Sequence, residues 1–442
     1  MVTWDYAAAA HLLRRAGFGA SRKEIEKAVR RGQAATVNRL LHFKPSNALP
    51  KKKDDLGKAQ RWWLLRMLGG APALQEKLVL FWHGHFATSV SKVDNAEMMI
   101  RQNGLFRAMA AGKFRDLLVA VSKDPAMIIW LDGIYNTKES PNENYAREVM
   151  ELFSLGVVNE AGQPNYTQTD VVEAARAFTG YSIDSGEFSF HPDEHDDGVK
   201  TVLGLTGTLS GDDVSIHLAG LTQCARFLAK KLWTFFAYPN PETGVIDALA
   251  QAYLANDTDI ASVLRAMFLR DEFYSARART ERVSPPVEFV VATLRAVKAK
   301  TNGDRLNYSL DTMGQDLFNP PNVAGWPGGL AWMTSVRQLE RFDFAWAVAR
   351  ARGHEHFLAT STKPLLEGIV KNPTAAQVVD HVLETLGPID APAAARAELA
   401  KYLTTGNNGD PLVVDLKDED FVDAKVRGLA GLALTLPEAQ LV

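Results

Sequence analysis

The chain has 442 residues, of which 46% are apolar and 23% are charged, and its 49 basic and 52 acidic residues give a formal net charge of −3. This balance is that of an ordinary globular protein and excludes a disordered, collagenous or disulfide-dense chain. The charge also argues against a nucleic-acid partner, because a phosphate-binding surface needs an excess of Lys and Arg. The single cysteine, Cys224, cannot form a disulfide within the chain.

Apolar residues recur at helical spacing along most of the chain, which predicts a mainly α protein. One helical stretch, over residues 61–83, is interrupted at Gly69-Gly70. No run of about 18 apolar residues occurs, so no membrane-spanning helix is expected. Further helices are expected over residues 96–111, 115–130, 142–155, 170–178, 215–236, 245–253, 260–269, 286–300, 335–352, 375–386, 391–403 and 422–434.

Strands are scarce in the pattern. Residues 181–190, with Gly186 as a turn residue, and residues 201–205 predict a small β-hairpin. The simplest division of the chain is a multi-helical single body over residues 1–363, which carries the candidate site, and a C-terminal helical extension over residues 364–442 that packs on it.

The first segment with chemical potential is Leu80-Phe81-Trp82-His83-Gly84-His85-Phe86. Gly84 is suited to end a helix in a left-handed turn, and such a turn would re-aim His85. The His-x-His spacing is found among ligands of zinc, copper and iron. We therefore consider His83 and His85 as metal ligands, and the alternative is a pair of histidines that cap a helix end under aromatic packing.

The second segment, residues 140–156, predicts a helix with Asn144, Glu148 and Glu151 within about 60° of one another around its axis. Arg147 precedes Glu151 by four residues and is placed to pair with it. Carboxylates on one stripe suit metal ligation or acid–base chemistry, because burial and a nearby like charge raise the pKa of one of them. The alternative is an ordinary amphipathic helix with solvated glutamates.

Two further segments are rich in acidic residues. Thr167 followed by Asp170 predicts a capping box, which gives Asp170 a structural alternative to a catalytic role. In the loop of residues 191–198, six of the eight side chains are able to bind a cation, although their spacing is not that of an EF-hand. His195 is a candidate metal ligand there, and a solvated acidic loop is the alternative.

Residues 318–329 contain prolines and glycines that fix an irregular path. Trp326 in this segment either plugs the core or lines a pocket, where an aromatic wall would suit a sugar. Several familiar signatures are missing: no nucleotide-binding loop, no G-x-S-x-G elbow and no H-E-x-x-H motif occurs.

In these segments the chain resembles a bacterial family catalogued as a domain of unknown function, DUF1800. The resemblance runs through nearly the whole chain and rests on several long motifs in the same order. These are His11-Leu12-Leu13-Arg14-Arg15 with Phe18-Gly19, Phe81-Trp82-His83-Gly84-His85-Phe86, Asn142-Glu143-Asn144-Tyr145-Ala146-Arg147-Glu148, Thr179-Gly180-Tyr181, His195-Asp196, Leu203-Gly204 and Asn319-Pro320-Pro321-Asn322-Val323-Ala324-Gly325-Trp326.

The resemblance implies no established activity. It implies that the motif residues share a site, which adds Asn144, Arg147 and Tyr181 as substrate-binding candidates. Many members of the family look exported and are encoded beside sulfatase-like proteins. The resemblance therefore implies a periplasmic or extracellular setting and a secreted sulfatase-like partner, although the first residues show no leader pattern.

Our leading hypothesis is a hydrolase that acts on an extracellular or envelope polymer, preferably a glycan. One version uses a divalent metal such as zinc, held by His83, His85 and His195, to activate water. The other uses paired carboxylates as acid and base. The carboxylates would come from Glu148, Glu151 and Asp170, and the stacking walls from Trp82 and Trp326.

Two alternatives belong to other classes. A non-enzymatic helical module that binds a secreted partner would use the same polar residues as a buried network that fixes helix packing. A redox metalloprotein would use the same histidines. The hydrolase hypothesis requires the imidazole pair and the acidic stripe to line one solvent-accessible hollow.

Overall fold

The computed structural model describes residues 2–442 except 45, 47, 52–53, 70–71, 356–357 and 388, and it describes the main chain alone for residues 353–355. Helices make up most of the described chain, which confirms the mainly α prediction. The strands in this part of the chain form two hairpins and one three-stranded sheet, all of them short. None of the described helices is long and apolar enough to cross a membrane.

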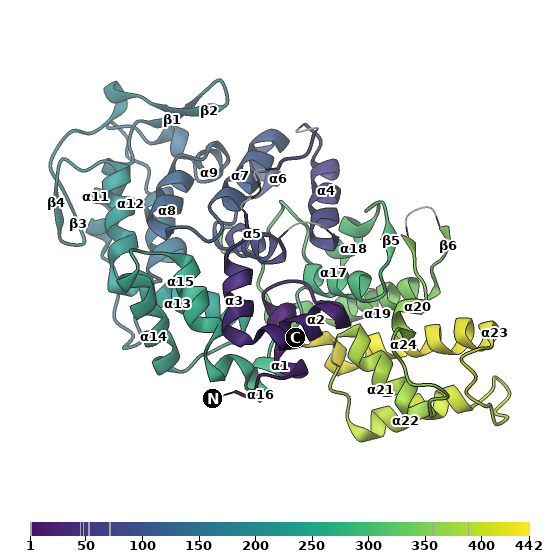
Figure 1. The fold of residues 1–442 in the computed structure, drawn as a ribbon. Coiled ribbons are helices and arrows are strands. Elements are labelled where there is room, and N and C mark those ends of the chain that lie inside the picture. The colour runs from purple at the N-terminus through teal and green to yellow at the C-terminus, as the bar shows by residue number, and fades with distance from the viewer. Residues whose placement is uncertain are drawn as a thin grey trace.

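The regular elements of the first 130 residues, where the structure describes them, are all helices (Figure 1). The expected interruption is confirmed at Gly69, since one helix ends at Leu68 and the next begins at Ala73, and Gly70 lies outside the described residues. The helices are α1 (Tyr6–Arg15), α2 (Arg22–Arg31), α3 (Gln33–Leu41), α4 (Leu56–Leu68), α5 (Ala73–His85), α6 (Val90–Val93), α7 (Ala96–Ala108), α8 (Phe114–Ser122) and α9 (Pro125–Trp130).

The expected helix end at Gly84 is wrong. Helix α5 continues through Gly84 to His85, and the Phe86 N–H still donates to the Trp82 carbonyl at 2.8 Å. The α5 helix is buried on nearly all sides, so apolar packing around it outweighs the low helix propensity of one glycine. As a result His83 and His85 point in divergent directions from a regular helix.

The middle of the chain holds both hairpins. In the first, Tyr181 pairs with Phe190, and Ser185 and Gly186 form the turn with φ values of 50° and 82°. The predicted hairpin is therefore confirmed at residues 181–190, and residues 201–205 belong to a second one. The elements are α10 (Asn144–Glu148), η2 (Val149–Ser154), α11 (Gln168–Ala177), β1 (Tyr181–Asp184), β2 (Glu187–Phe190), β3 (Lys200–Val202), β4 (Leu205–Gly207), α12 (Gly211–Gly220), α13 (Thr222–Phe236), α14 (Thr243–Ala255) and α15 (Ile260–Phe268).

The segment expected to form one α-helix over residues 142–155 changes type at its centre. Helix α10 ends at Glu148, and η2 is a π-helix in which hydrogen bonds span five residues. The Ser154 hydroxyl donates to the Val149 carbonyl inside it. A π-helix fits one more residue into a turn, so the faces calculated for a continuous α-helix do not hold beyond Val149.

The last third of the chain includes residues 364–442, for which the sequence predicts a C-terminal extension. Helix α24 packs along α19, and the Val442 N–H donates to the Arg282 carbonyl at 2.9 Å. One hydrophobic cluster runs from Leu12 in α1 to Val378 and Leu429 in the extension. The elements are α16 (Ala276–Thr280), α17 (Pro286–Ala296), β5 (Lys300–Thr301), α18 (Leu306–Thr312), η5 (Gly329–Met333), α19 (Ser335–Arg350), β6 (Arg352–Glu355), β7 (Leu358–Ala359), α20 (Lys363–Leu366), α21 (Ala375–Leu386), α22 (Ala393–Thr404), α23 (Glu419–Phe421) and α24 (Arg427–Thr435).

Candidate functional site

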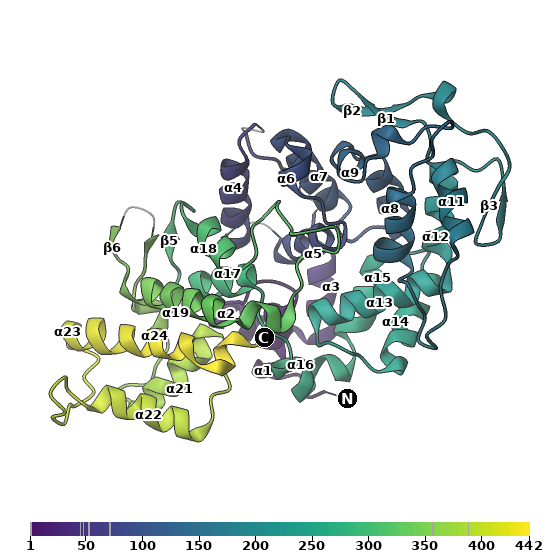
Figure 2. The same cartoon turned by 180° about the vertical axis from the view of Figure 1, so that it is seen from behind.

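A cavity of about 750 Å³ opens between α5, α13 and the two segments 281–288 and 324–332. Its size lies in the range of small-molecule sites. In Figure 2, α13 lies below and beside α5, and the green loop that precedes α19 crosses in front of α5. We call this hollow the α5–α13 cavity.

Aromatic rings form much of its wall. Phe81 from α5 contacts Phe235 from α13 with ring centroids 5.3 Å apart, and Phe227 lies about two turns earlier in α13. Trp326 and Trp332, from the loop before α19, also line the cavity. The indole N–H of Trp332 is buried and has no hydrogen-bond partner in the described structure. Such a wall favours a ligand with a planar or apolar body.

The loop that carries Trp326 is fixed tightly to α5. The Phe318 N–H donates to His83 Nε2 at 3.0 Å, and the Phe318 carbonyl accepts from the Val90 N–H. Gly325 has φ of 85°, and a Cβ atom there would lie 2.5 Å from the Gly84 carbonyl oxygen. Both the conformation and the close approach therefore require glycine at this position.

His85 lines the cavity and keeps one buried hydrogen-bond acceptor unused. Its Nε2 lies 3.0 Å from the Phe153 carbonyl and must donate to it. Nδ1 therefore carries a lone pair, and this buried atom has no partner in the described residues. Burial, helped by the nearby Lys231 charge, holds the pKa of His85 well below its usual range, so the ring stays neutral.

Lys231 brings a positive charge to the same wall. Its Nζ lies 3.3 Å from the Leu152 carbonyl and 5.2 Å from the centre of the Phe227 ring. No described carboxylate lies within ion-pair distance of it. Burial lowers the pKa of Lys231 to about 8, which leaves the amine mostly protonated at neutral pH.

The π-helix η2 holds both of these groups. Leu152 and Phe153 lie in its last turn, where main-chain carbonyls lack partners within the helix. These are the carbonyls that bind Lys231 and His85. The irregular helix is thus the element that orients the two polar groups of the cavity.

A buried ionic cluster forms the floor. Glu288 lies 2.8 Å from Lys77 Nζ and 2.6 Å from Arg282 Nη2, and all three side chains are buried. Arg14 and Arg15 of α1 lie close enough to interact with this group electrostatically. Burial alone would raise the pKa of Glu288, but Arg282 and Lys77 outweigh it and hold the pKa at about 2. Four basic side chains thus lie near one carboxylate in a region where water screens charge poorly, and burial lowers the pKa of one of them, Lys77, to about 7.

The predicted acidic stripe lies elsewhere. Neither Glu148 nor Glu151 lines the α5–α13 cavity. Burial, and then the Glu151 charge, raise the pKa of the half-buried Glu148. Glu151 accepts a hydrogen bond from the Tyr166 hydroxyl at 2.9 Å. The expected pair between Arg147 and Glu151 is wrong, because Arg147 extends toward the preceding turn and pairs with Glu143 at 2.7 Å.

Three more of the predicted site residues have structural partners. Asn144 donates to an Asp132 carboxylate oxygen at 3.1 Å, and the Tyr181 hydroxyl donates to Asp212 at 2.8 Å. The predicted capping box is confirmed: Asp170 accepts from the Thr167 N–H, and its other oxygen accepts from the Leu203 N–H. These hydrogen bonds lower the pKa of Asp170 despite its partial burial, which disfavours its use as an acid or base.

The predicted metal ligands do not converge. His83 uses Nε2 to accept from Phe318, and burial lowers its pKa to about 3. The Nδ1 atom of His195 lies 2.8 Å from the Thr179 carbonyl, beside the first hairpin. No group of three or more potential His, Cys, Asp or Glu ligands exists among the described residues. Metal ligation by His83, His85 and His195 stays a prediction.

Trp82, predicted to stack on a substrate, is a core residue. Its ring is fully buried, and its indole N–H donates to the Ala110 carbonyl at 2.8 Å. Trp326, by contrast, is half-buried and does line the cavity, as one of the two alternatives for it predicted.

The sequence reasoning missed the α13 contribution. Lys231 lies seven residues after the buried Cys224 and four after Phe227, so it falls on the inward side of α13. A lysine at such a position was the available signal. The buried cluster of Lys77, Arg282 and Glu288 had no comparable signal, because its members are far apart in the chain.

No curated protein and no solved structure is detectably similar to this chain. A family model described as "Protein of unknown function (DUF1800)" matches residues 11–441. The match covers nearly the whole chain, and the protein therefore belongs to the DUF1800 family.

Proposed function

We propose that the protein binds a small anionic ligand with an aromatic or apolar body in the α5–α13 cavity. The observation that carries this proposal is Lys231, a half-buried cation on an aromatic wall with no described carboxylate as its partner. A charge held in this way is costly unless an anion compensates it. The basic side chains around Glu288 add a positive electrostatic potential, which also favours an anionic ligand.

Further polar atoms narrow the ligand chemistry. His85 Nδ1 accepts hydrogen bonds and is unpaired, so the ligand is expected to carry a hydroxyl or N–H group beside its anionic group. Trp332, which lines the same cavity, has an indole N–H donor that is also buried and unpaired. Leaving buried donors and acceptors unpaired costs about 1–3 kcal/mol each, which a matching ligand would recover.

Binding is better supported here than cleavage of a glycan. Three carboxylates line the cavity, and all have cationic partners: Glu288 is ionised and tied to two cations, Glu160 pairs with Arg226 at 3.1 Å, and Glu281 pairs with Arg277 at 2.9 Å. The Arg226 partner lowers the pKa of Glu160, so neither Glu160 nor Glu288 is suited to donate a proton. Hydrolysis that uses Glu148 and Glu151 stays a prediction, supported by the raised pKa of Glu148.

A set of matched probes tests the proposal. 3-Hydroxy-2-naphthoate carries the aromatic body, the anion and the hydroxyl donor, whereas 2-naphthoate lacks the hydroxyl and 2-naphthol lacks the anion. We expect the affinity order hydroxynaphthoate, naphthoate, naphthol in a fluorescence titration. Lys231→Met should weaken hydroxynaphthoate binding by about 10–100-fold, the value of one charge-assisted hydrogen bond.

The neighbouring residue supplies the control. Lys230 also lines the cavity but is exposed, so Lys230→Met removes the same charge and is expected to weaken binding by less than about threefold. Equal losses in the two variants, or equal affinity for naphthoate and naphthol, would contradict an anion site at Lys231. Far-UV circular dichroism checks that both variants are folded.

A further inference from the structure

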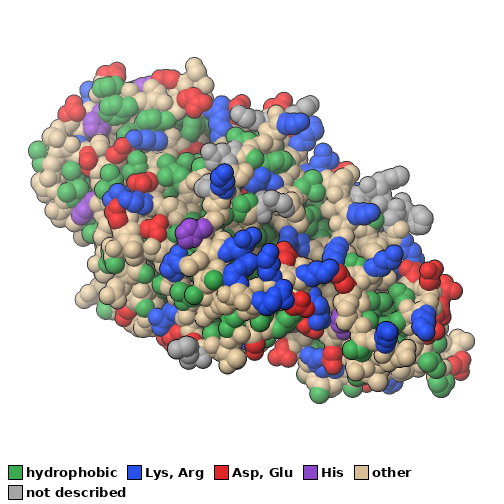
Figure 3. Space-filling model, in the orientation of Figure 1, with side chains coloured by type: hydrophobic (Ala, Val, Ile, Leu, Met, Phe, Trp, Pro, Cys, Tyr) green, Lys and Arg blue, Asp and Glu red, His purple; other side chains and the backbone are tan. Residues whose placement is uncertain are grey.

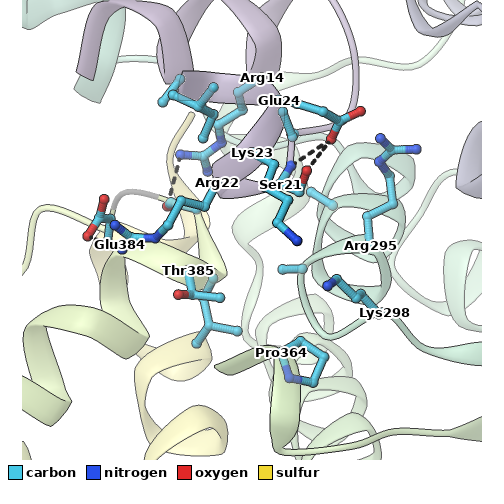
Figure 4. A pocket seen from close by; sticks show the side chains of 18 of the residues that line it. Arg14, Ser21, Arg22, Lys23, Glu24, Arg295, Lys298, Pro364, Glu384 and Thr385 are labelled. Atoms are coloured by element: carbon cyan, nitrogen blue, oxygen red, sulfur yellow. Dashed lines mark hydrogen bonds and ion pairs between the residues drawn. The ribbon is translucent and has the colours of Figure 1, made fainter. Parts of the chain in front are cut away.

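A second hollow, of about 630 Å³, lies where the extension meets the body. Its walls are the first turns of α2, the end of α17, the segment around α20 and the end of α21, as Figure 4 shows from close by. Figure 3 shows Lys and Arg side chains gathered on this face around α2. We call this hollow the seam cavity.

Two lysines of the body share one carboxylate of the extension. Lys23 Nζ lies 3.3 Å from one oxygen of Glu367, and Lys298 Nζ lies 2.6 Å from the other. Arg22 has its own partner, Glu384, at 3.0 Å. Half of the charge of Lys23 and Lys298 is therefore left without a direct counterion.

Two arginines that line the same cavity bind main-chain carbonyls. Arg14 donates to the Leu441 carbonyl at 2.7 Å, and Arg295 donates to the Leu68 carbonyl at 3.0 Å. No described carboxylate lies within ion-pair distance of either guanidinium. The Nε atom of Arg295 is buried and has no hydrogen-bond partner in the described residues.

The remaining carboxylates on the cavity wall do not neutralise the excess positive charge. Glu24 is turned toward Ser21, whose N–H and hydroxyl donate to it at 2.8 and 2.7 Å (Figure 4). Glu26 lines the wall without an ion pair to any of these cations. The two lysines, Arg14 and Arg295 thus offer more N–H donors than Glu367 uses.

We propose that the seam cavity binds a multivalent oxyanion of the phosphate type, held by Lys23, Lys298 and Arg295. A tetrahedral oxyanion presents more acceptors than a single carboxylate to Lys23 and Lys298, which meet at Glu367, and to Arg295 on the same cavity wall. Glu367 competes for the same two lysines. Because Glu367 belongs to the extension and the lysines to the body, the bound oxyanion exchanges a contact between the two parts for a contact with the ligand.

Titration calorimetry with inorganic phosphate, at constant ionic strength and with sulfate as a second arm, tests this site. We expect saturable binding of both oxyanions and none of chloride. Lys298→Gln and Arg295→Gln should each weaken phosphate binding by about tenfold or more. Lys401→Gln, at a side chain that is 71% exposed, removes the same charge elsewhere and is expected to leave the affinity unchanged.

One variant is expected to bind phosphate more tightly than the wild type, a result that misfolding would not produce. Glu367→Gln removes the competing carboxylate and is expected to tighten phosphate binding by about threefold or more, because Lys23 and Lys298 no longer have to leave it. Wild-type protein without saturable phosphate binding would overturn the proposal. So would a folded Glu367→Gln protein that binds phosphate no more tightly, or a Lys298→Gln protein that binds it equally well.

Discussion

The α5–α13 cavity and the hairpin region around α11 both contain family motifs rich in polar residues, yet they differ in how these residues are satisfied. In the hairpin region Arg176 pairs with Glu173 at 2.9 Å and with Asp196 at 2.7 Å, and Asp170 caps its helix. At the cavity His85 Nδ1 has no partner and Lys231 has no carboxylate among the described residues. Our proposal of a binding site at the cavity therefore rests on polar groups that lack partners, and not on the density of polar residues.

The largest expected effect concerns the cavity floor. Glu288→Ala leaves Lys77 and Arg282 buried without their shared carboxylate, and we expect a loss of about 3–5 kcal/mol in the free energy of unfolding. Urea denaturation measures it. Glu173→Ala, which removes a partly exposed carboxylate in the hairpin region, should cost much less. Similar losses would mean that the two regions do not differ as described.

The lowered pKa of Glu288 predicts that the free energy of unfolding decreases in acid. The pKa of Glu288 is about 2 in the folded chain, below its ordinary value of 4.5, so the group stabilises the fold above pH 4.5. This contribution is lost as the pH falls from 4.5 toward 2. Unfolding free energies measured over this interval should fall more steeply for the wild type than for Glu288→Ala.

The next effect concerns ligand binding at the cavity. An anion needs the protonated amine of Lys231, whose pKa is lowered to about 8. The affinity for hydroxynaphthoate should therefore be constant below pH 7 and fall as the pH rises through 8, by up to about tenfold per pH unit. Lys231→Met should remove this dependence. A wild-type affinity that does not change up to pH 10 would argue against Lys231 as the anion contact.

The smallest effect is expected in the hairpin region. Arg176→Gln breaks partly exposed ion pairs with Glu173 and Asp196, and we expect a loss of about 1 kcal/mol in stability. Hydroxynaphthoate affinity should be unchanged. A change in affinity larger than about threefold would show that the two regions are coupled, which would weaken the comparison.

Much of the fold followed from local patterns. The helix break before Ala73, the hairpin turn at Gly186 and the capping box at Thr167 depend on residues close together in the chain, and all three are confirmed. The predicted helix end at Gly84 was wrong because tertiary packing around α5 keeps that residue helical. The predicted continuous α-helix was wrong because the chain forms the π-helix η2 from Val149 onward.

The candidate site was less predictable. His85 and Trp326 were identified, and they do line one cavity, but Lys231 and Trp332 join them only through the packing of α13 and the loop before α19 against α5. Glu148 was predicted to share this hollow but does not line it. The order of motifs along the sequence carries no information on which of them meet in space. Whether any of these residues takes part in catalysis stays a prediction.

The π-helix turn between Val149 and Ser154 ties the chemistry of the cavity to the type of one helical turn. A π-helix turn holds one more residue than an α-helix turn, so a change to α-helix at the same chain length would rotate everything after it by about 100°. The carbonyls that now face His85 and Lys231 would then face away, although no residue lining the cavity had been replaced. Substitutions in η2 that stabilise an α-helix would therefore alter the cavity without replacing any residue that lines it.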